Sequence, residues 1–127
     1  EMDEVVYRRC RYVVDENQRL LDACAALEKG DYVTFGQKMN GSHEGLSRQY
    51  EVSCDELDFL ADIGHRTDGV LGARMMGGGF GGCTINLVRA EAYDGYLAEA
   101  TDRFAHRFGH APRVIEVNIS QGARRIG

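Results

Sequence analysis

The chain has 127 residues, which is enough for one ordinary domain and too few for two substantial ones. Hydrophobic residues make up 43% and charged residues 28%, values close to those of soluble globular domains, so neither disorder nor a fibrous repeat is indicated. The net charge of −5 argues against a nucleic-acid surface, and no apolar run approaches the roughly 18 residues that span a bilayer. We therefore expect a cytoplasmic protein whose partners are neither nucleic acids nor membranes.

The first half of the chain has the period of helices. Apolar residues recur at three- and four-residue steps over residues 3–29, at Val6, Cys10, Val13, Leu20, Cys24 and Leu27. Gly30 would end this helix in a left-handed cap, and Asp31 is a natural N-cap for a second helix. His43 lies on the apolar stripe of the second helix, which predicts a hydrogen-bonded core or interface histidine.

A third helix is predicted after residue 53. Ser53 and Glu56 have the spacing of a capping box, in which each side chain bonds the other residue's backbone N–H. Leu57 and Leu60 then face one way, and Gly64 is expected to end the helix.

The second half changes to the period of strands. Residues 70–76 and 83–88 read as two strands joined by a glycine cluster, and residues 114–119 alternate again. Between them, residues 91–108 return to helical spacing, and Gly109 closes that helix. This order predicts an α+β fold in which a small antiparallel sheet packs against helices.

Neither a disulfide framework nor a metal site is predicted. The sequence has four widely spaced cysteines: Cys10, Cys24, Cys54 and Cys83. Three fall at apolar positions of predicted elements, so we expect buried reduced thiols. His106 and His110 are four residues apart, but Gly109 interrupts the predicted helix and no third ligand is evident.

The glycine cluster is the most unusual feature of the sequence. Of the 16 glycines, five lie within residues 77–82, where Phe80 is the exception. Consecutive glycines permit positive φ and let several N–H groups face one concavity that suits a phosphate. No Lys-Ser/Thr follows, so this is no P-loop, and a strand follows where a dinucleotide fingerprint would begin a helix. A close-packed connection or a mobile tip would also explain the cluster.

Two residues beside these glycines have roles that the pattern leaves open. Phe80 is expected to anchor the loop to an apolar surface. Arg74 could reach a phosphate, although an arginine in a strand more often forms a structural ion pair.

Residues 72–83, GARMMGGGFGGC, closely resemble the third sequence motif of galactokinases, which belong to the GHMP small-molecule kinase superfamily. The familiar form of that motif is G-[AS]-R-M-T-G-G-G-F-G-G-C. The resemblance covers essentially the whole chain, through RCRYVVDEN at 9–17, YEVSCDEL at 50–57 and GAR at 122–124. One departure is Met76, where the family often has Thr.

The resemblance implies that residues 1–127 are a GHMP kinase C-terminal domain, with a ferredoxin-like α+β sheet, taken from a longer two-lobed enzyme. The sugar-recognition segment, the phosphate-binding loop and the catalytic Asp of the family belong to an N-terminal lobe that this sequence lacks. No catalytic residue is therefore expected here. By the same resemblance, support for the ATP-phosphate loop would come from Gly77, Gly78, Gly79, Phe80, Gly81 and Gly82.

The activity implied for the intact enzyme is transfer of the γ-phosphoryl group of ATP, with Mg²⁺, to the C1 hydroxyl of α-D-galactose. The isolated chain would be inactive, and the face that packs on the other lobe would favour self-association. Sugar specificity belongs to the missing lobe, so an N-acetylgalactosamine or arabinose kinase remains an alternative. A non-catalytic regulatory protein that binds galactose and ATP is another.

Overall fold

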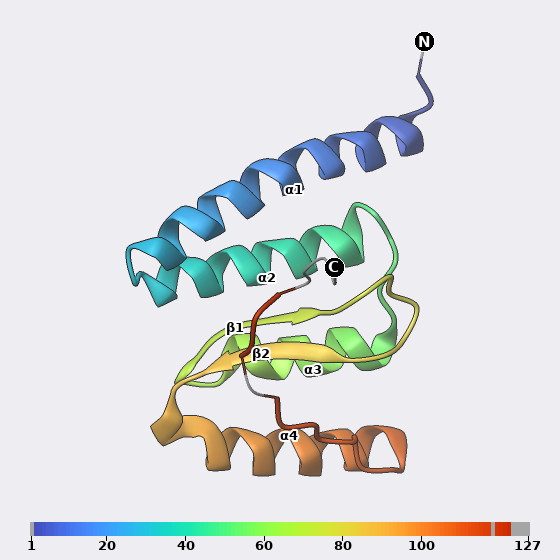
Figure 1. Cartoon of the computed structure of the whole chain (residues 1–127). Coiled ribbons are helices and arrows are strands. Elements are labelled where there is room, and N and C mark those ends of the chain that lie inside the picture. The colour runs from blue at the N-terminus through green and yellow to red at the C-terminus, as the bar shows by residue number, and fades with distance from the viewer. Residues whose placement is uncertain (1, 118, 123–127) are drawn as a thin grey trace, which may run out of the picture.

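The computed structural model describes residues 2–117 and 119–122. Four α-helices, two strands and one short 3₁₀ helix follow one another along these residues (Figure 1). In chain order they are α1 (Glu4–Glu28), α2 (Tyr32–Arg48), α3 (Asp55–Arg66), β1 (Val70–Met75), β2 (Thr84–Val88), η1 (Ala90–Ala92) and α4 (Tyr93–Phe108). The predicted α+β class with a small antiparallel sheet is confirmed.

Three predicted helix boundaries are confirmed by their caps. Gly30 has a positive φ of 71° between α1 and α2. The Asp31 side chain accepts a hydrogen bond from the Thr34 N–H at 3.0 Å, as an N-cap residue should. Gly109 ends α4 in the left-handed conformation, with a φ of 79°.

The predicted boundaries of α3 are wrong at both ends. Cys54, not Ser53, is the N-cap residue and forms no side-chain cap bond, and the Ser53 hydroxyl donates to Asp58 at 2.6 Å. Gly64 lies inside the helix, which continues to Arg66. A Cβ at Gly64 would lie 2.6 Å from the Ala73 side chain, so this glycine serves close packing rather than termination.

The sheet consists of β1 and β2 in the described residues, paired antiparallel with Ala73 opposite Asn86 and Met75 opposite Thr84. The third predicted strand is wrong for residues 114–117 and 119, which have no strand structure and are exposed; residue 118 lies outside the described part. The alternating apolar pattern there, including Ile115 and Val117, pairs with no strand in the described part of the chain.

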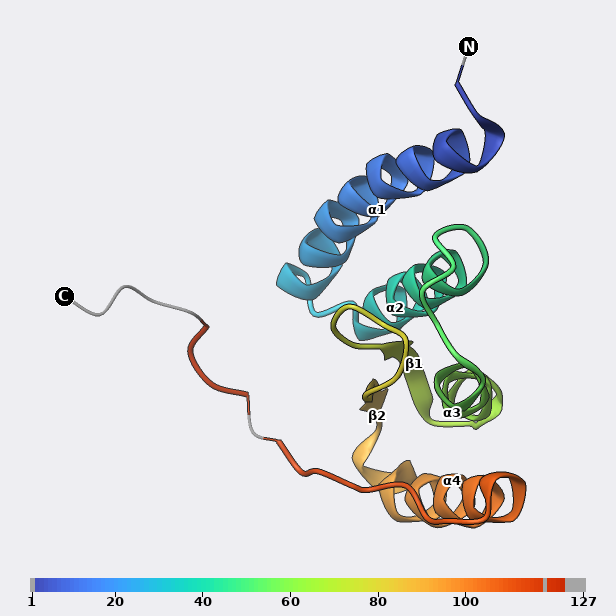
Figure 2. The same ribbon diagram turned by 90° about the vertical axis from the view of Figure 1, so that its right-hand side faces the viewer.

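The helices pack on the sheet in a stack, with α2 and α3 against β1, α1 against α2, and α4 against α3 (Figures 1 and 2). Leu57, Ile63 and Met75 are the largest fully buried side chains. At the contact of α2 with β1 the two backbones lie so close together that a Cβ at Gly36 would be 2.0 Å from the Leu71 carbonyl oxygen.

The apolar stripe predicted for residues 3–29 does not face this core. Helix α1 packs through Tyr12, Ala23 and Ala26, whereas Leu20 is 62% exposed. The prediction of buried cysteines is wrong. On α1, Cys10 and Cys24 belong to the same exposed stripe. Cys10, Cys24 and Cys83 are exposed and Cys54 is half-buried, all as free thiols.

None of the described helices has both the length and the apolarity needed to cross a membrane.

Candidate functional site

The glycine-rich loop, residues 77–82, joins β1 to β2 in an unusual backbone conformation. Positive φ angles occur at Gly77 (78°), Gly79 (87°), Phe80 (60°), Gly81 (135°) and Gly82 (100°). L side chains rarely adopt this region, so the chain path through the loop depends on glycine. Phe80 is the one residue of the loop that adopts it with a side chain.

The loop is attached to the rest of the domain at its base and at its tip. At the base, the Met76 N–H donates to the Cys83 carbonyl at 3.0 Å. At the tip, the Phe80 N–H donates to the Val52 carbonyl at 2.7 Å, and a Cβ at Gly79 would lie 2.0 Å from that same oxygen. The loop therefore lies directly on the connection between α2 and α3, as the neighbouring traces in Figure 1 show.

Most of the loop faces open space. No described atom lies within 4 Å of the position that a Cβ would occupy at Gly77, Gly78, Gly81 or Gly82. Close packing inside this chain thus explains Gly79, and positive φ angles explain Gly77, Gly81 and Gly82, whereas neither explains Gly78. An open backbone with N–H donors fits a phosphate group or the loop that holds one.

The prediction that the Phe80 side chain anchors the loop is wrong. This side chain is 77% exposed, whereas the backbone N–H of the same residue makes the contact to Val52. The sequence pattern identified the anchoring residue but not the group that anchors.

Arg74 lies on β1, one residue before the last residue of the strand, Met75. Its Nε donates to the Met75 carbonyl at 3.0 Å, and the predicted structural ion pair is absent among the described residues. The phosphate contact at Arg74 stays a prediction. Arg124, in the GAR segment at residues 122–124, lies outside the described residues.

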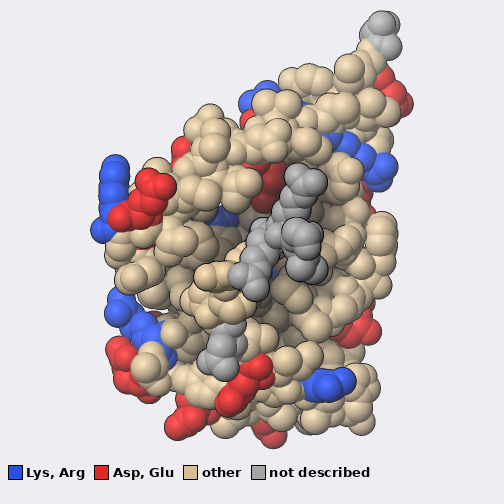
Figure 3. Space-filling view, in the orientation of Figure 1, with Lys and Arg blue, Asp and Glu red and all other residues tan. Residues whose placement is uncertain are grey.

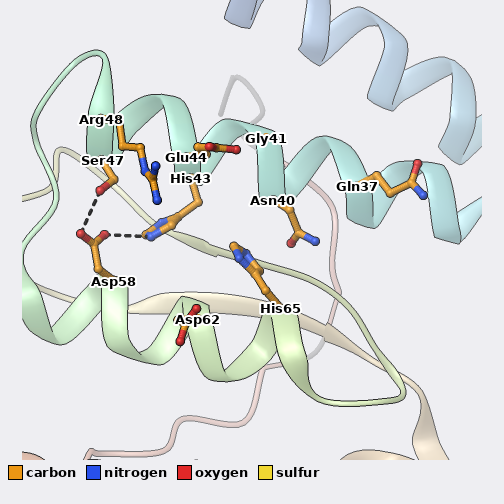
Figure 4. A pocket seen from close by; sticks show the side chains of 10 residues that line it. All are labelled: Gln37, Asn40, Gly41, His43, Glu44, Ser47, Arg48, Asp58, Asp62 and His65. Carbon is orange, nitrogen blue, oxygen red and sulfur yellow. Dashed lines mark hydrogen bonds and ion pairs between the residues drawn. The ribbon is translucent and has the colours of Figure 1, made fainter.

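A polar groove of about 690 Å³ lies between α2 and α3, beside β1 (Figure 4). From its walls, side chains reach the backbone of β1. Asn40 Oδ1 accepts from the Ala73 N–H at 2.9 Å, and His43 Nδ1 accepts from the Met75 N–H at 3.0 Å. His65 Nε2 donates to the Ala73 carbonyl at 2.8 Å. These bonds satisfy the edge of β1 that does not pair with β2.

The prediction for His43 is confirmed, since the residue is 5% exposed and hydrogen-bonded through both ring nitrogens. Burial lowers the pKa of His43, and the neighbouring Asp58 opposes that shift only in part. The imidazole is therefore neutral near pH 7. A neutral ring can accept the Met75 N–H through Nδ1, which an imidazolium cannot.

Sequence reasoning missed the other residues of this groove. Asn40 and His43 are one helical turn apart, and Ala73 and Met75 are two residues apart on a strand. Nothing in the sequence brings this helix beside this strand. Serine and asparagine within a helix, at Asn40 and Ser47, were the available signal, because such residues are weak helix formers.

Basic side chains do not gather into a continuous surface on the face shown in Figure 3, where Lys and Arg are scattered among uncharged residues. This agrees with the net charge of −5. On that face, an anion would depend on backbone N–H groups rather than on a cluster of cations.

Residues 23–106 match the family model described as GHMP kinases C terminal, and the chain belongs to this family. It is similar over nearly its whole length to the C-terminal region of galactokinases. A galactokinase of Clostridium beijerinckii is 41% identical over 125 residues, which are 98% of this chain and 32% of that protein. A galactokinase of Streptococcus thermophilus is 44% identical over 122 residues, which are 96% of this chain and 31% of that protein.

Solved structures agree with the sequence relatives. Lactococcus lactis galactokinase complexed with galactose superposes with a TM-score of 0.82 at 38% identity, covering 86% of this chain and 28% of that one. The L. major mevalonate kinase in complex with R-mevalonate has a TM-score of 0.60 at 34% identity, covering 68% of this chain and 26% of that one. The chain thus spans about one third of the length of the curated relatives it matches.

Proposed function

We propose that residues 1–127 form the C-terminal lobe of a galactokinase, completed in the parent protein by an N-terminal lobe. The observation that carries the proposal is the glycine-rich loop, whose four open glycines have no packing role among the described residues. Identity of about 40% to galactokinases over nearly the whole chain supports galactose as the sugar.

The parent protein would transfer the γ-phosphoryl group of ATP to the C1 hydroxyl of α-D-galactose. Such a reaction depends on positioning and on stabilising charge at the phosphate oxygens, so backbone N–H groups can contribute without acting as acid or base. In this proposal Gly77, Gly78, Gly79, Phe80, Gly81 and Gly82 support the ATP-phosphate site, and Arg74 is an additional contact.

The Mg²⁺ that accompanies ATP would be held by the rest of the parent. The described residues contain no group of three His, Cys, Asp or Glu side chains that could hold a metal ion. The same division assigns the catalytic groups and the sugar pocket to the N-terminal lobe, so the isolated chain is expected to be inactive.

An assay of the full-length parent beside the isolated chain tests this proposal. We expect ATP-dependent formation of galactose 1-phosphate by the parent and none by the chain. Preference for N-acetylgalactosamine or arabinose in the same sugar panel would move the assignment to another kinase of the superfamily. Binding of galactose and ATP without phosphoryl transfer would instead indicate a regulatory protein.

We further propose that the exposed stripe of α1 is covered in the parent and drives self-association of the isolated chain. Val13 is 45% exposed, Leu20 62% and Leu27 48%, all on one face of the helix. Exposed apolar patches of this kind bind partners. The Leu20→Glu variant should remain monomeric in sedimentation experiments at concentrations where the wild type associates. A wild-type chain that stays monomeric at high concentration would contradict the proposal.

A further inference from the structure

Four side chains near one end of the groove between α2 and α3 form a hydrogen-bonded cluster around one carboxylate. Ser47 Oγ donates to Asp58 Oδ2 at 2.8 Å, and Ser53 Oγ donates to Asp58 Oδ1 at 2.6 Å. His43 Nε2 lies 3.0 Å from the same Oδ1 atom. Figure 4 shows Ser47 and His43 converging on Asp58 from α2, and we call these four residues the Asp58 cluster.

The proton of His43 has a defined position in this cluster. Because Nδ1 accepts the Met75 N–H at 3.0 Å, the neutral ring carries its proton on Nε2 and donates it to Asp58. A ring with both nitrogens bonded in a site 5% exposed is held in one orientation.

The same residues do not form a nucleophilic triad. A catalytic serine would need to donate its proton to a histidine nitrogen. Ser47 and Ser53 both donate to Asp58 instead, and neither nitrogen of His43 is free to accept. The Asp58 cluster therefore fixes the positions of the side chains and backbone groups that are bonded to it.

The groups it holds lie at both attachments of the glycine-rich loop. Through His43, the cluster bonds the Met75 N–H in the last residue of β1, two residues before the loop begins. Through Ser53, it holds the residue that follows Val52, and the Val52 carbonyl accepts the Phe80 N–H at the tip of the loop. One carboxylate thus connects to the base and to the tip.

We propose that His43 and Asp58 are positioning residues for the glycine-rich loop, acting through Met75 and Val52. What the positioned loop does rests on the proposed function. The positioning itself does not, because it can be measured in this chain without any catalysis.

The direct test follows the backbone amides of the chain by NMR hydrogen exchange. Asp58→Ala removes the acceptor of three donors, whereas Asp62→Ala is a matched control one turn later on α3 that removes only the exposed ion pair to Arg66. We expect exchange of the Met75 and Phe80 amides to accelerate about tenfold or more in Asp58→Ala and to change less than about twofold in Asp62→Ala.

Amides in α4, such as that of the buried Phe104, report on overall unfolding. Their exchange should accelerate less than that of Met75 and Phe80 in Asp58→Ala and stay unchanged in Asp62→Ala. Asp58→Asn should restore slow exchange at Phe80, because the amide oxygen can still accept from His43 and Ser53 and the Ser47 hydroxyl can turn to accept from the amide group. Unchanged exchange at Phe80 in Asp58→Ala, or equal acceleration of the α4 amides, would overturn the proposal.

Should Asp58→Ala fail to fold, Ser53→Ala removes one donor and leaves the bonds of Asp58 to His43 and Ser47. Exchange at Phe80 is then expected to accelerate while that of Met75 is retained; equal rates to the wild type would overturn the assignment. In the full-length parent, Asp58→Ala should lower kcat with the KM for galactose unchanged. If the parent transfers no phosphate, the proposed function fails while the exchange result stands.

Discussion

Glycines at the contact of α2 with β1 differ from the open glycines of the loop in what surrounds them. At the contact of α2 with β1, a Cβ at Gly36 would lie 2.0 Å from the Leu71 carbonyl oxygen and one at Gly72 would lie 2.7 Å from the Gly36 Cα. In the loop, a Cβ at Gly78 or Gly81 would meet no atom within 4 Å. The first group serves packing within the chain. The second group has no packing role among the described residues and leaves the loop backbone open to an approaching group.

Substitution within the first group should have the largest effect. Gly36→Val places a branched side chain against the backbone of β1, and we expect the free energy of unfolding to fall by about 3 kcal/mol. Urea unfolding followed by circular dichroism measures this change. Gly95→Ala in α4 is the control, because its site is open; it should gain about 0.5 kcal/mol. Equal stability of Gly36→Val and the wild type would contradict the packing role.

Gly78→Ala tests the second group. Among the loop glycines Gly78 combines an open Cβ position with a φ outside the left-handed region, so an alanine fits without strain. We expect the free energy of unfolding to change by less than about 0.5 kcal/mol. In the full-length parent, kcat for phosphoryl transfer should fall about tenfold, since the added methyl obstructs close approach to the backbone. Full activity would show that nothing approaches the loop at this position.

Acid should weaken the contact between α2 and β1. The pKa of His43 is lowered by burial, so the unfolded chain takes up a proton at a higher pH than the folded chain does. His43 faces Asp58 and His65 on α3 and Arg74 on β1. Its stabilisation is complete above the ordinary value of 6.5 and is lost as the pH falls through the lower folded pKa.

Denaturant unfolding between about pH 7.5 and about pH 5 measures this dependence. His43→Asn is the matched control, because its amide oxygen can accept the Met75 N–H but does not titrate. The acid-induced loss of stability should be smaller in this variant than in the wild type. Identical pH profiles for the two proteins would contradict the role assigned to the neutral ring.

The smallest effect is expected for Phe80→Ala. The side chain is 77% exposed, and the anchoring bond to Val52 comes from the backbone N–H, which alanine retains. The free energy of unfolding should change by less than about 0.5 kcal/mol. A loss of about 2 kcal/mol would instead show that the Phe80 side chain anchors the loop.

Local signals predicted the fold well where the interaction is local. The caps at Gly30, Asp31 and Gly109 depend on neighbours a few residues away, and all three predictions are confirmed. The capping box at Ser53 failed, since the helix N-cap is Cys54 and the Ser53 hydroxyl donates to the Asp58 carboxylate. Propensity and spacing do not say whether a hydroxyl caps its own helix or bonds another nearby side chain.

The candidate site was also predicted only in part, because some of its contacts join segments that are distant in the sequence. Glycine content located the loop, and the apolar position of His43 predicted its burial. The stripe of α1 was read correctly as apolar, but the pattern cannot tell whether this chain or another body covers it, and Leu20 is exposed. The bonds from Asn40 and His43 to β1 arise from packing between distant segments, which a single sequence does not reveal.

The central claim is that the open loop is the supporting half of a phosphoryl-transfer site. The most direct measurement is ³¹P NMR of the full-length parent with ATP, Mg²⁺ and galactose, recorded beside the isolated chain and the Gly78→Ala parent. We predict a galactose 1-phosphate signal that grows with the wild-type parent, grows about tenfold more slowly with Gly78→Ala, and is absent with the isolated chain. A signal from the isolated chain, or equal rates for the two parent proteins, would contradict the account.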